Sequence, residues 1–342
     1  MSGINTAVNR LLNDFGLRDF QLERIRAGRN SRVWRVDSYA GVSYIIKEYF
    51  RHPSDPRDRL STEYEFLAFL QSQGLSNVPI PLAKDPGGNV GLYSYLPGNP
   101  VTKIDSNYIQ QAAQFILDIN QDIPVELAPL LPSASEACFS IADHLCCVRQ
   151  RIERLQLALE SNSNSLTISV REFVNNTLCN AYEEIVHHIE SRISAKDIEK
   201  TLDPSQRILS PSDYGFHNIL EFKGQLFFLD FEYAGWDDPT KLLCDFASQP
   251  QYPVSREHLR EFADHLHVLP TVSQLWVRSQ PLLPLHRLKW CCILLNEFRV
   301  QDRQRRHHAG DDQSDKLTIQ WHKAQTYFQE NMLKQMRDGS WL

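Results

Sequence analysis

The sequence has little that would direct it to a nucleic acid or into a membrane. Acidic residues outnumber basic ones by 42 to 36, and the net charge of −6 offers no basic surface to a phosphate backbone. No apolar run reaches the roughly 18 residues that a membrane-spanning helix requires. The first residues, MSGINTAVNRLLNDFGL, lack a basic start followed by an apolar segment, so they do not resemble a secretory signal. We therefore expect a cytoplasmic protein with neither a nucleic-acid nor a membrane partner.

CxxC motifs and glycine-rich phosphate-binding motifs are also missing. The seven cysteines, an odd number, show no CxxC spacing, and two adjacent pairs, Cys146–Cys147 and Cys291–Cys292, fall in helix-like segments. This pattern favours reduced thiols in a core over disulfides or a metal site. Only 14 of the 342 residues are glycine, and none belongs to a GxGxxG phosphate-binding motif. Any nucleotide site must therefore be inferred from other residues.

The N-terminal region has the pattern of a small β-rich lobe. A chain of 342 residues is longer than one simple core usually needs, so we expect two lobes. The segments FQLERIRAG, SRVWRVDSY and VSYIIKEYF predict strands, and DPRDRLSTEYEFLAFLQSQG has a helical period. Asp55, before Pro56, predicts the start of that helix, and Gly74 predicts its end. VPIPLAKDPGGNVGLYSYLPG predicts two strands around a DPGG turn.

Helical periodicity dominates the rest of the chain. Amphipathic patterns occur in SNYIQQAAQFILDINQD, SIADHLCCVRQRIERLQLAL, SVREFVNNTLCNAYEEIVHHIESRI, SREHLREFADHLHV and LHRLKWCCILLNEFRV, and a long C-terminal helix follows. The predicted fold class is therefore α+β and bilobal. Residues 1–98 form the small lobe with one helix, and residues 99–342 form a large, mainly helical lobe that contains one short hairpin.

That hairpin lies in ILSPSDYGFHNILEFKGQLFFLDFEYAGWDDP, residues 208–239. NILEF and QLFFLD predict two strands joined at a Lys223-Gly224 turn, so Asp230 ends one strand beside the start of the other, where Asn218 lies. Carboxylate and amide oxygens on a rigid hairpin suit Mg²⁺, which is completed by substrate phosphates. Asp213, on the preceding loop, has the position of a base that accepts a hydroxyl proton.

These features resemble the aminoglycoside phosphotransferase and choline kinase superfamily, whose fold is similar to that of protein kinases. The family's catalytic loop has His-Gly-Asp, four further residues and Asn, and an Asp-Phe-Gly-like triplet follows a strand later. The corresponding segments here are PSDYGFHN and the DFE of Asp230, Phe231 and Glu232. LDFEYAGWDDP also resembles the choline kinase pattern. The resemblance implies that Asp213 is the catalytic base and that Asn218 and Asp230 bind Mg²⁺.

The resemblance also implies an ATP site in the small lobe. Lys47, in the strand SYIIKEYF, would touch the α- and β-phosphates, and Glu63 on the following helix would be its ion-pair partner. From the residues alone, Lys47 could instead face solvent, and Glu63 could lie on the exposed face of an amphipathic helix. AGRNSRVWRV occupies the place of the phosphate-covering loop, where Ser31 and Arg32, together with Asn30, would offer main-chain N–H groups.

The segment GLYSYLPG resembles the hinge between the two lobes. By that resemblance, Ser94 and Leu96 would form main-chain hydrogen bonds with adenine, and Tyr93 would line the adenine pocket.

The catalytic loop departs from the family pattern at two positions. Pro211 replaces the family histidine and Ser212 replaces the glycine. That histidine organises the loop and is not the proton acceptor, so the change bears on loop geometry more than on chemistry. His217, beside Asn218, could replace it as an organiser, although a lone histidine on such a loop is more often structural, and we leave it out of the catalytic set.

Two further segments admit two interpretations each. Trp236 with Asp237 and Asp238 would suit a cationic acceptor, but Asp238 before a proline also predicts the N-cap of the next helix. The cations of DRQRRHHAGDD predict the end of a helix at Gly310, where they complement the helix dipole, in preference to an anion site.

The sequence thus predicts an ATP-dependent and Mg²⁺-dependent transfer of the γ-phosphate to a hydroxyl of a small molecule. No Ala-Pro-Glu-like segment follows Asp230, which speaks against a protein substrate. A sugar, an aminoglycoside and an amino alcohol such as choline all stay open as acceptors. The alternative is a nucleotide-binding pseudokinase that acts as a scaffold or regulator, which the altered Pro211 and Ser212 favour.

Overall fold

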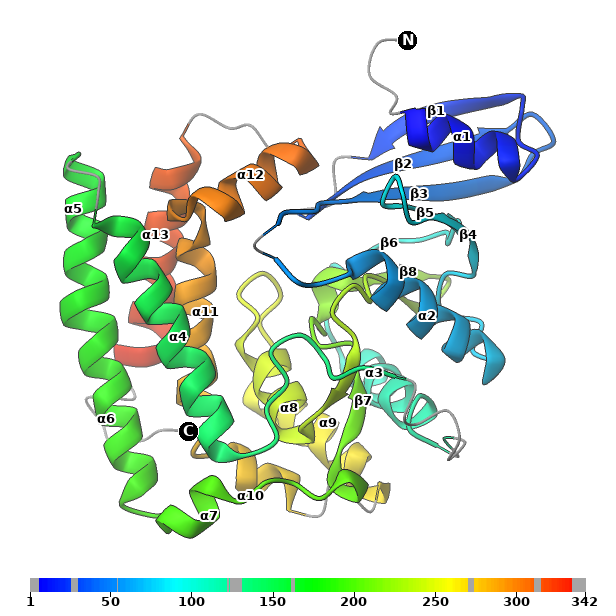
Figure 1. The fold of residues 1–342 in the computed structure, drawn as a ribbon. Helices are drawn as coiled ribbons and strands as arrows, with labels where there is room; N and C mark the ends of the chain where they lie inside the picture. The colour runs from blue at the N-terminus through cyan, green and yellow to red at the C-terminus, as the bar shows by residue number, and fades with distance from the viewer. Residues whose placement is uncertain are drawn as a thin grey trace.

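The computed structural model describes residues 6–25, 30–53, 55–121, 123, 131–160, 164–269, 274–310 and 315–333. Gly28, in the predicted phosphate-covering loop, lies outside these residues. Figure 1 shows a small lobe built on a β-sheet and a larger, mainly helical lobe beside it. The predicted α+β, two-lobed class is confirmed. The division between residues 98 and 99 stays a prediction.

The small lobe is an antiparallel five-stranded sheet with two helices. The strand order is β1-β2-β3-β5-β4, so β3 is the central strand. The elements are α1 (Thr6–Asp14), β1 (Phe20–Ile25), β2 (Ser31–Ser38), β3 (Ser43–Tyr49), α2 (Arg59–Ser72), β4 (Pro81–Asp85) and β5 (Val90–Ser94). The apolar side chains of β2, β3 and β5 pack with α1 in a small core.

Helix α2 starts later than the sequence predicted. Its N-cap is Asp58, whose carboxylate accepts a hydrogen bond from the Ser61 N–H at 3.0 Å. Asp55 instead forms ion pairs with Arg57 at 2.7 Å and Arg59 at 2.6 Å. The prediction of Asp55 as the start was wrong because its carboxylate satisfies two guanidinium groups and not the free N–H groups of the helix.

The large lobe contains the remaining helices. They are α3 (Ser106–Asp118), α4 (Ile141–Leu159), α5 (Ser165–Glu172), η2 (Phe173–Leu178), α6 (Cys179–Glu190), α7 (Ala195–Glu199), η3 (Pro204–Gln206), η4 (Phe216–Asn218), α8 (Pro239–Ser248), α9 (Arg256–His265), η5 (Leu266–Val268), α10 (Leu275–Ser279), α11 (Leu283–Leu294), η7 (Leu295–Phe298), α12 (Val300–Ala309), α13 (Lys316–Phe328) and η8 (Gln329–Leu333). None of the helices in the described ranges is long and apolar enough to cross a membrane.

Two small sheets of short strands lie at the centre of the large lobe. β6 (Asn99–Pro100), β8 (Ile219–Phe222) and β9 (Gln225–Phe228) form one small sheet, and β7 (Ile208–Ser210) pairs with β10 (Gly235–Asp237). One apolar core joins α2, α3, α8 and α9 to these strands. A second core lies between α4, α6, α11 and α13, which form the helical arm in Figure 1. The site described next lies where the first core meets the small lobe.

Candidate active site

Strand β3, helix α2 and the segment after β9 meet at the Lys47 ammonium. Lys47 lies on the central strand β3, and its Nζ is 2.7 Å from Oε2 of Glu63 on α2. The same Nζ is 2.8 Å from Oδ1 of Asp230, which follows β9. The Lys47 and Glu63 side chains are only 13% and 2% exposed. The geometry therefore excludes the solvent-facing alternatives for both residues.

Lys47, Glu63 and Asp230 form a cluster whose charges stabilise one another. Burial acts to lower the pKa of Lys47, but the charges of Asp230 and Glu63 outweigh burial and raise that pKa well above its ordinary value. The hydroxyl of Tyr49 donates a hydrogen bond to Glu63 Oε2 at 2.6 Å and lies 2.7 Å from the hydroxyl of Tyr93. The ammonium is thus held charged and fixed by partners on two lobes.

The Lys47–Glu63 pair makes a prediction for a double-mutant cycle. We expect Lys47→Met to reduce turnover more than Glu63→Gln, because only the first change removes the charge that faces the nucleotide. The double variant should lose less than the sum of the single losses, since residues that act as a unit are non-additive. The measurement is acceptor-dependent ADP formation by the four proteins.

Glu65, two residues further on α2, supplies the matched control. Its side chain is 59% exposed and pairs with Lys84 at 3.2 Å. Glu65→Gln should leave turnover unchanged. Additive losses for Lys47 and Glu63, or a Glu63→Gln variant as active as the wild type, would contradict a coupled role.

The segment after β9 is anchored in the core on both sides of Asp230. The Leu229 N–H donates to the Asn218 carbonyl at 2.9 Å, which extends the hairpin pairing by one residue. The buried ring of Phe231 packs on Phe66 of α2, with ring centroids 5.5 Å apart. The hairpin turns at Lys223 and Gly224, with φ of 52° and 80°, as a two-residue turn requires. The predicted hairpin thus places Asn218 opposite Leu229, the residue before Asp230.

Asn218 and Asp230 have the chemistry of a divalent-cation site. Asn218 Nδ2 donates to the Asp213 carbonyl at 3.0 Å, so the amide oxygen is the atom that can face a cation. Asp230 adopts φ of +67°, an unfavourable region for a non-glycine residue that is often found at functional sites. Among the described residues no group of three or more His, Cys, Asp or Glu side chains is arranged to hold a metal ion. Two protein oxygens fit Mg²⁺, which takes its other ligands from water and phosphates.

Asp213 lies on the loop after β7 and is held by His217. The Nε2 of His217 is 3.1 Å from Asp213 Oδ1. Burial acts to raise the pKa of Asp213, but the charge and the hydrogen bond of His217 bring that pKa below its ordinary value. Asp213 is therefore an ionised, oriented carboxylate. His217, which the sequence offered as an organiser of this loop and not as a catalytic residue, contacts Asp213 directly.

Ser212 adopts a conformation that normally favours glycine. Its φ is +67°, and its hydroxyl donates to the Ser135 carbonyl at 3.4 Å. A left-handed conformation costs an L-residue roughly 1–2 kcal/mol. The position where the family pattern has glycine is thus one where serine is strained.

This strain predicts an order of stability for two variants. Ser212→Gly and Ser212→Ala both lose the hydroxyl, but only alanine keeps the conformational cost, so we expect the glycine variant to be more stable by roughly 1 kcal/mol. Urea unfolding measures the difference. At Ser169, which is exposed on α5, the order should invert, because glycine costs about 1 kcal/mol relative to alanine inside a helix. An alanine variant at 212 as stable as the glycine variant would show that no strain exists there.

Strand β2 brings Ser31 toward the cluster and turns the Arg32 side chain away from it. Ser31 is opposite Tyr49 in the β2–β3 ladder, and Arg32 is opposite Glu48. Since side chains alternate between the faces of a sheet, Ser31 shares the face of Lys47 and Arg32 does not. The Ser31 hydroxyl lies 3.4 Å from Glu232 Oε2. The Arg32 side chain therefore cannot contact a nucleotide here, and only the main-chain groups of Arg32 could do so.

The Arg32 side chain forms a hydrogen bond with the C-terminal end of α12. Arg32 Nε donates to the His308 carbonyl at 2.7 Å, and Arg24 Nη2 donates to the Ala309 carbonyl at 3.0 Å. The helix ends at Gly310, with φ of +81°, as the sequence predicted. Two arginines of the small lobe therefore bind the free carbonyls of a helix of the large lobe.

Asn30 and Glu232 link β2 to the segment after Asp230. Asn30 Nδ2 donates to Glu232 Oε1 at 2.7 Å. Burial and the charge of Asp230 raise the pKa of Glu232 to about 7, although Lys47 opposes this shift. The predicted phosphate-covering segment thus contacts the segment that carries the candidate metal ligand.

The predicted hinge, residues 91–98, begins within β5 and continues past its end. The Ser94 N–H donates to the Ile80 carbonyl at 2.9 Å, so it is the Ser94 carbonyl that could bind a base. Leu96 is half-buried just beyond the sheet. Tyr93 is only 2% exposed and belongs to the core behind Glu63, where its hydroxyl meets that of Tyr49. A contact between Tyr93 and adenine stays a prediction.

Asp237 and Asp238 do not form a site for a cationic acceptor. Asp237 is fully buried and binds Lys241 Nζ at 2.6 Å. Asp238 is the N-cap of α8, accepts from the Thr240 N–H at 2.7 Å and pairs with Arg278 at 3.0 Å. The capping interpretation is confirmed, and the proposed pairing of Trp236 with two free carboxylates was wrong because both carboxylates are already satisfied.

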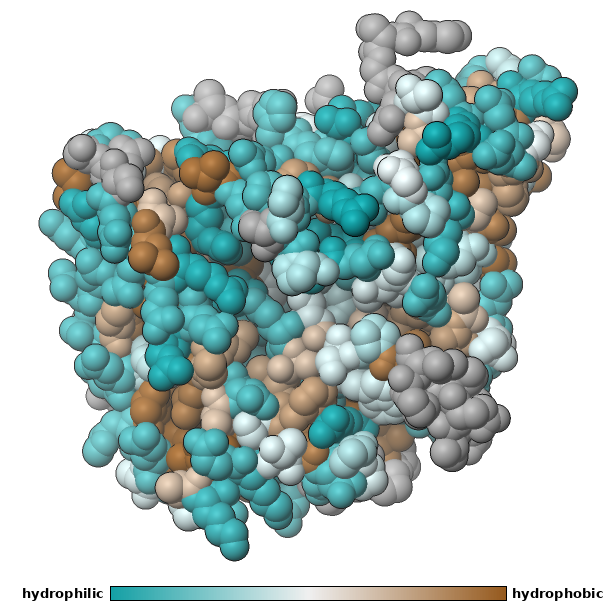
Figure 2. Space-filling model, viewed as in Figure 1, coloured by the Kyte–Doolittle hydropathy of each residue, from teal (hydrophilic) through white to brown (hydrophobic). Residues whose placement is uncertain are grey.

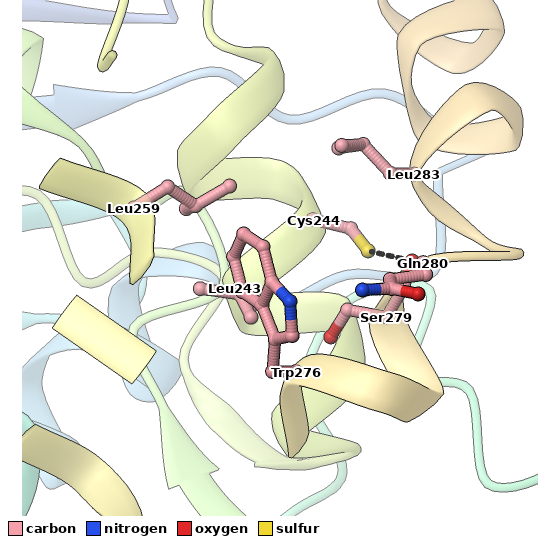
Figure 3. A pocket seen from close by; sticks show the side chains of 7 residues that line it. All are labelled: Leu243, Cys244, Leu259, Trp276, Ser279, Gln280 and Leu283. Atoms are coloured by element: carbon pink, nitrogen blue, oxygen red, sulfur yellow. Dashed lines mark hydrogen bonds between the residues drawn. The ribbon is translucent and has the colours of Figure 1, made fainter. Parts of the chain in front are cut away.

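A small cavity lies between α8, α9, α10 and α11, away from the cluster (Figure 3). Its volume is about 10 Å³, the space of about one water molecule. Leu243, Leu259 and Leu283 line it, with Trp276 and Gln280 at its side, and Cys244 Sγ lies 3.7 Å from the Ser279 carbonyl. The cavity is too small for a substrate, and its residues belong to the packing between helices.

The comparison with family models decides the class. The model of the phosphotransferase enzyme family, APH, matches residues 21–269, most of the chain and all the residues of the cluster. The chain belongs to the phosphotransferase enzyme family. The predicted resemblance and the predicted class, a small-molecule kinase, are confirmed. No curated protein matches the sequence significantly.

Solved structures of phosphotransferases share the fold. A complex of APH(2″)-IIa with gentamicin superposes with a TM-score of 0.63 at 16% identity and covers 95% of this chain and 97% of that one. Spectinomycin phosphotransferase APH(9)-Ia, with ADP and spectinomycin, has a TM-score of 0.60 at 13% identity over 95% and 100% of the two chains. Plasmodium vivax ethanolamine kinase has a TM-score of 0.58 at 13% identity over 90% and 81%. These superpositions establish a common fold, and the low identities leave the substrate open.

Proposed function

We propose that the chain transfers the γ-phosphate of ATP to a hydroxyl group of a small molecule. The observation that carries the proposal is the convergence of Lys47, Glu63 and Asp230, with Asp213 and Asn218 joined to them through the same hairpin. A scaffold would need no ionised, oriented Asp213. Phosphoryl transfer needs positioning and neutralisation of charge more than covalent chemistry, and these residues can supply both.

Each residue has a distinct role in the proposal. Asp213 accepts the proton of the acceptor hydroxyl as the oxygen attacks. Lys47, fixed by Glu63, neutralises charge on the α- and β-phosphates. Asn218 and Asp230 would hold Mg²⁺, which, when bound, neutralises phosphate charge and orients the γ-phosphate.

The remaining predicted contacts concern the nucleotide. The main chain of Ser31 and Arg32 lies beside the phosphates, and the Ser94 carbonyl and the Leu96 N–H bind adenine, with Tyr93 behind them. Support for nucleotide and divalent-metal use comes from related folds that were solved with ADP, and with AMP-PNP and Ca²⁺.

The proposal is tested by a screen of ATP consumption. Purified protein with Mg²⁺ and ATP is offered sugars, aminoglycosides and amino alcohols, and ADP formation and acceptor mass are measured. We expect ADP to form with one class of acceptor and the product to gain one phosphate, while the Asp213→Asn protein stays inactive. A rise of the unfolding temperature with Mg²⁺–ATP but no transfer to any acceptor would favour the pseudokinase alternative. No rise and no transfer would contradict both.

A further inference from the structure

Four arginines gather where the helical arm meets α12. Arg151 and Arg154 lie on α4, Arg299 follows η7, and Arg305 lies on α12. Helix α4 packs against η7, which brings the two pairs together. Burial first, and then the charges of Arg154, Arg151 and Arg305, lower the pKa of Arg299 despite the opposing charge of Asp302. Arg299 is therefore close enough to the other three guanidinium groups to be repelled by them.

Within the described part of the chain, two carboxylates, Glu136 and Asp302, form the ion pairs of these four arginines. Glu136 accepts from Arg151 Nε at 3.1 Å and lies 3.7 Å from Arg154 Nη1. Asp302 pairs with Arg299 and with Arg305, each at 2.7 Å. The excess of two positive charges lies within a chain whose net charge is −6.

Arg305 adds an unsatisfied donor to this excess charge. The residue is 8% exposed, and its Nε–H is buried with no acceptor among the described residues. A buried N–H without an acceptor costs free energy, which an oxyanion bound beside it would recover.

The arginine cluster borders the catalytic loop. Glu136 lies next to Ser135, whose carbonyl accepts from Ser212, the residue before Asp213. Lys289 of α11 acts electrostatically on both Asp213 and Glu136. In Figure 1, α4, α11 and α12 stand around one side of this junction, and Figure 2 shows mostly hydrophilic residues over α12 and the middle of α4.

One arginine of the cluster, Arg305, also acts electrostatically on the nucleotide side of the site. The charges of Arg305, Arg59 and Arg57 all act on Tyr233, which follows Glu232 in the segment after Asp230. A molecule with its hydroxyl at Asp213 would therefore have guanidinium groups along one flank.

We infer that the acceptor is an anionic hydroxyl compound, one that carries a phosphate or carboxylate group besides the hydroxyl that is phosphorylated. This inference rests on the proposed function. Guanidinium groups bind planar oxyanions through paired hydrogen bonds, and a cationic acceptor would meet like charge there. The nearby carboxylates cannot bind a cationic acceptor, because each already has a cationic partner. Asp237 pairs with Lys241, Asp238 with Arg278 and Asp245 with Lys289.

The test uses one skeleton in several charge states: glucose, glucosamine, glucuronate and glucose 6-phosphate, with choline, ethanolamine and glycerate as a second set. We expect the anionic members to be phosphorylated with a kcat/KM at least about 10-fold above that of the neutral and cationic members. The comparison of glucose 6-phosphate with glucuronate then shows whether the site prefers a phosphate or a carboxylate group. A preference for a neutral or cationic member overturns the inference.

Substitutions of two arginines, one on α4 and one beside α12, test whether the arginine cluster causes the preference for anionic acceptors. Arg154→Gln and Arg299→Gln should each raise KM for the anionic acceptor by about 10- to 100-fold, the scale of a hydrogen bond to a charged group, with kcat within about 3-fold. The control is Arg149→Gln on the outer side of α4, where Arg149 is 59% exposed and pairs with Glu153 at 3.8 Å. A KM that is unchanged in Arg154→Gln and Arg299→Gln, or raised equally in Arg149→Gln, overturns the inference.

A binding measurement separates this inference from the proposed function. Inorganic phosphate is titrated calorimetrically into the wild type, Arg154→Gln, Arg299→Gln, Arg149→Gln and Lys47→Met proteins without ATP. Binding that weakens about 10-fold in the first two variants but not in the last two supports an oxyanion site distinct from the nucleotide site, even if no acceptor is phosphorylated. No binding, or equal binding in the wild type and the first two variants, overturns the inference. Absence of transfer to any acceptor with such binding intact would refute the proposed function alone.

Discussion

We expect the Asp213→Asn protein to lose at least about 100-fold in kcat, the scale of a general-base contribution. Asparagine has the shape of aspartate but cannot accept the proton that leaves the acceptor hydroxyl. The loop itself should survive the change, because Asn218 holds residue 213 through the main-chain carbonyl and not through the carboxylate. The measurement is steady-state ADP formation with an acceptor identified in the screen.

The same variant should bind Mg²⁺–ATP with an affinity close to that of the wild type, since Asp213 is not a proposed metal ligand. Calorimetric titration of a non-hydrolysable ATP analogue supplies this control. Wild-type turnover with a verified acceptor would remove Asp213 from the role of base. A parallel loss of nucleotide affinity would instead mean that the loop had collapsed.

The second large effect is expected at Asp230. Asp230→Asn should remove Mg²⁺-dependent nucleotide binding and lower turnover by at least about 100-fold, as expected when a group that stabilises phosphoryl charge is lost. Asparagine is the appropriate replacement because it tolerates the φ of +67° at this position, where alanine would add strain. The Lys47 ammonium keeps Glu63 as a partner, so the fold should persist.

Asp264→Asn is the matched control for this change. Asp264 lies on α9, is 58% exposed and pairs with Arg260 at 3.0 Å. It should leave Mg²⁺ dependence and turnover unchanged. Titration of ATP at several Mg²⁺ concentrations measures both variants. Normal Mg²⁺ dependence in the Asp230→Asn protein would show that the metal assignment is wrong.

Local patterns were sufficient for the parts of the fold that local forces decide. The hairpin was predictable because Lys223-Gly224 favours a two-residue turn and the flanking apolar runs fix the register. That register alone sets Asn218 opposite Leu229, the residue before Asp230. The sequence also predicted the strand of Lys47 and the helix of Glu63, but their contact at 2.7 Å depends on how α2 packs on the sheet.

Other features depend on contacts that no local pattern encodes. Asp55 and Asp58 are both acidic residues near the start of α2, and the neighbouring Arg57 and Arg59 decide which of them caps it. The sequence left Asp237 and Asp238 open either to a cationic acceptor or, for Asp238, to a helix N-cap, and their ion pairs with Lys241 and Arg278 decide against the acceptor.

The arginine cluster is the clearest case of information held only in three dimensions. Arg151 and Arg154 are about 150 positions from Arg299 and Arg305, and each pair alone has the pattern of a solvated helix face. The sequence interpretation assigned DRQRRHHAGDD to the helix dipole alone. That holds at Gly310, but Arg305 belongs to the cluster.

The central claim, that this site moves a phosphoryl group from ATP to a hydroxyl, is tested most directly by following that group. ATP labelled with ¹⁸O on the γ-phosphate is incubated with Mg²⁺, the protein and the acceptor found in the screen, and the products are analysed by mass spectrometry. The account predicts that the labelled phosphoryl oxygens appear in the acceptor phosphate, in equal amount to the ADP formed, and that the Asp213→Asn protein produces neither. Label found only in inorganic phosphate, or ATP left intact with every acceptor, would contradict it.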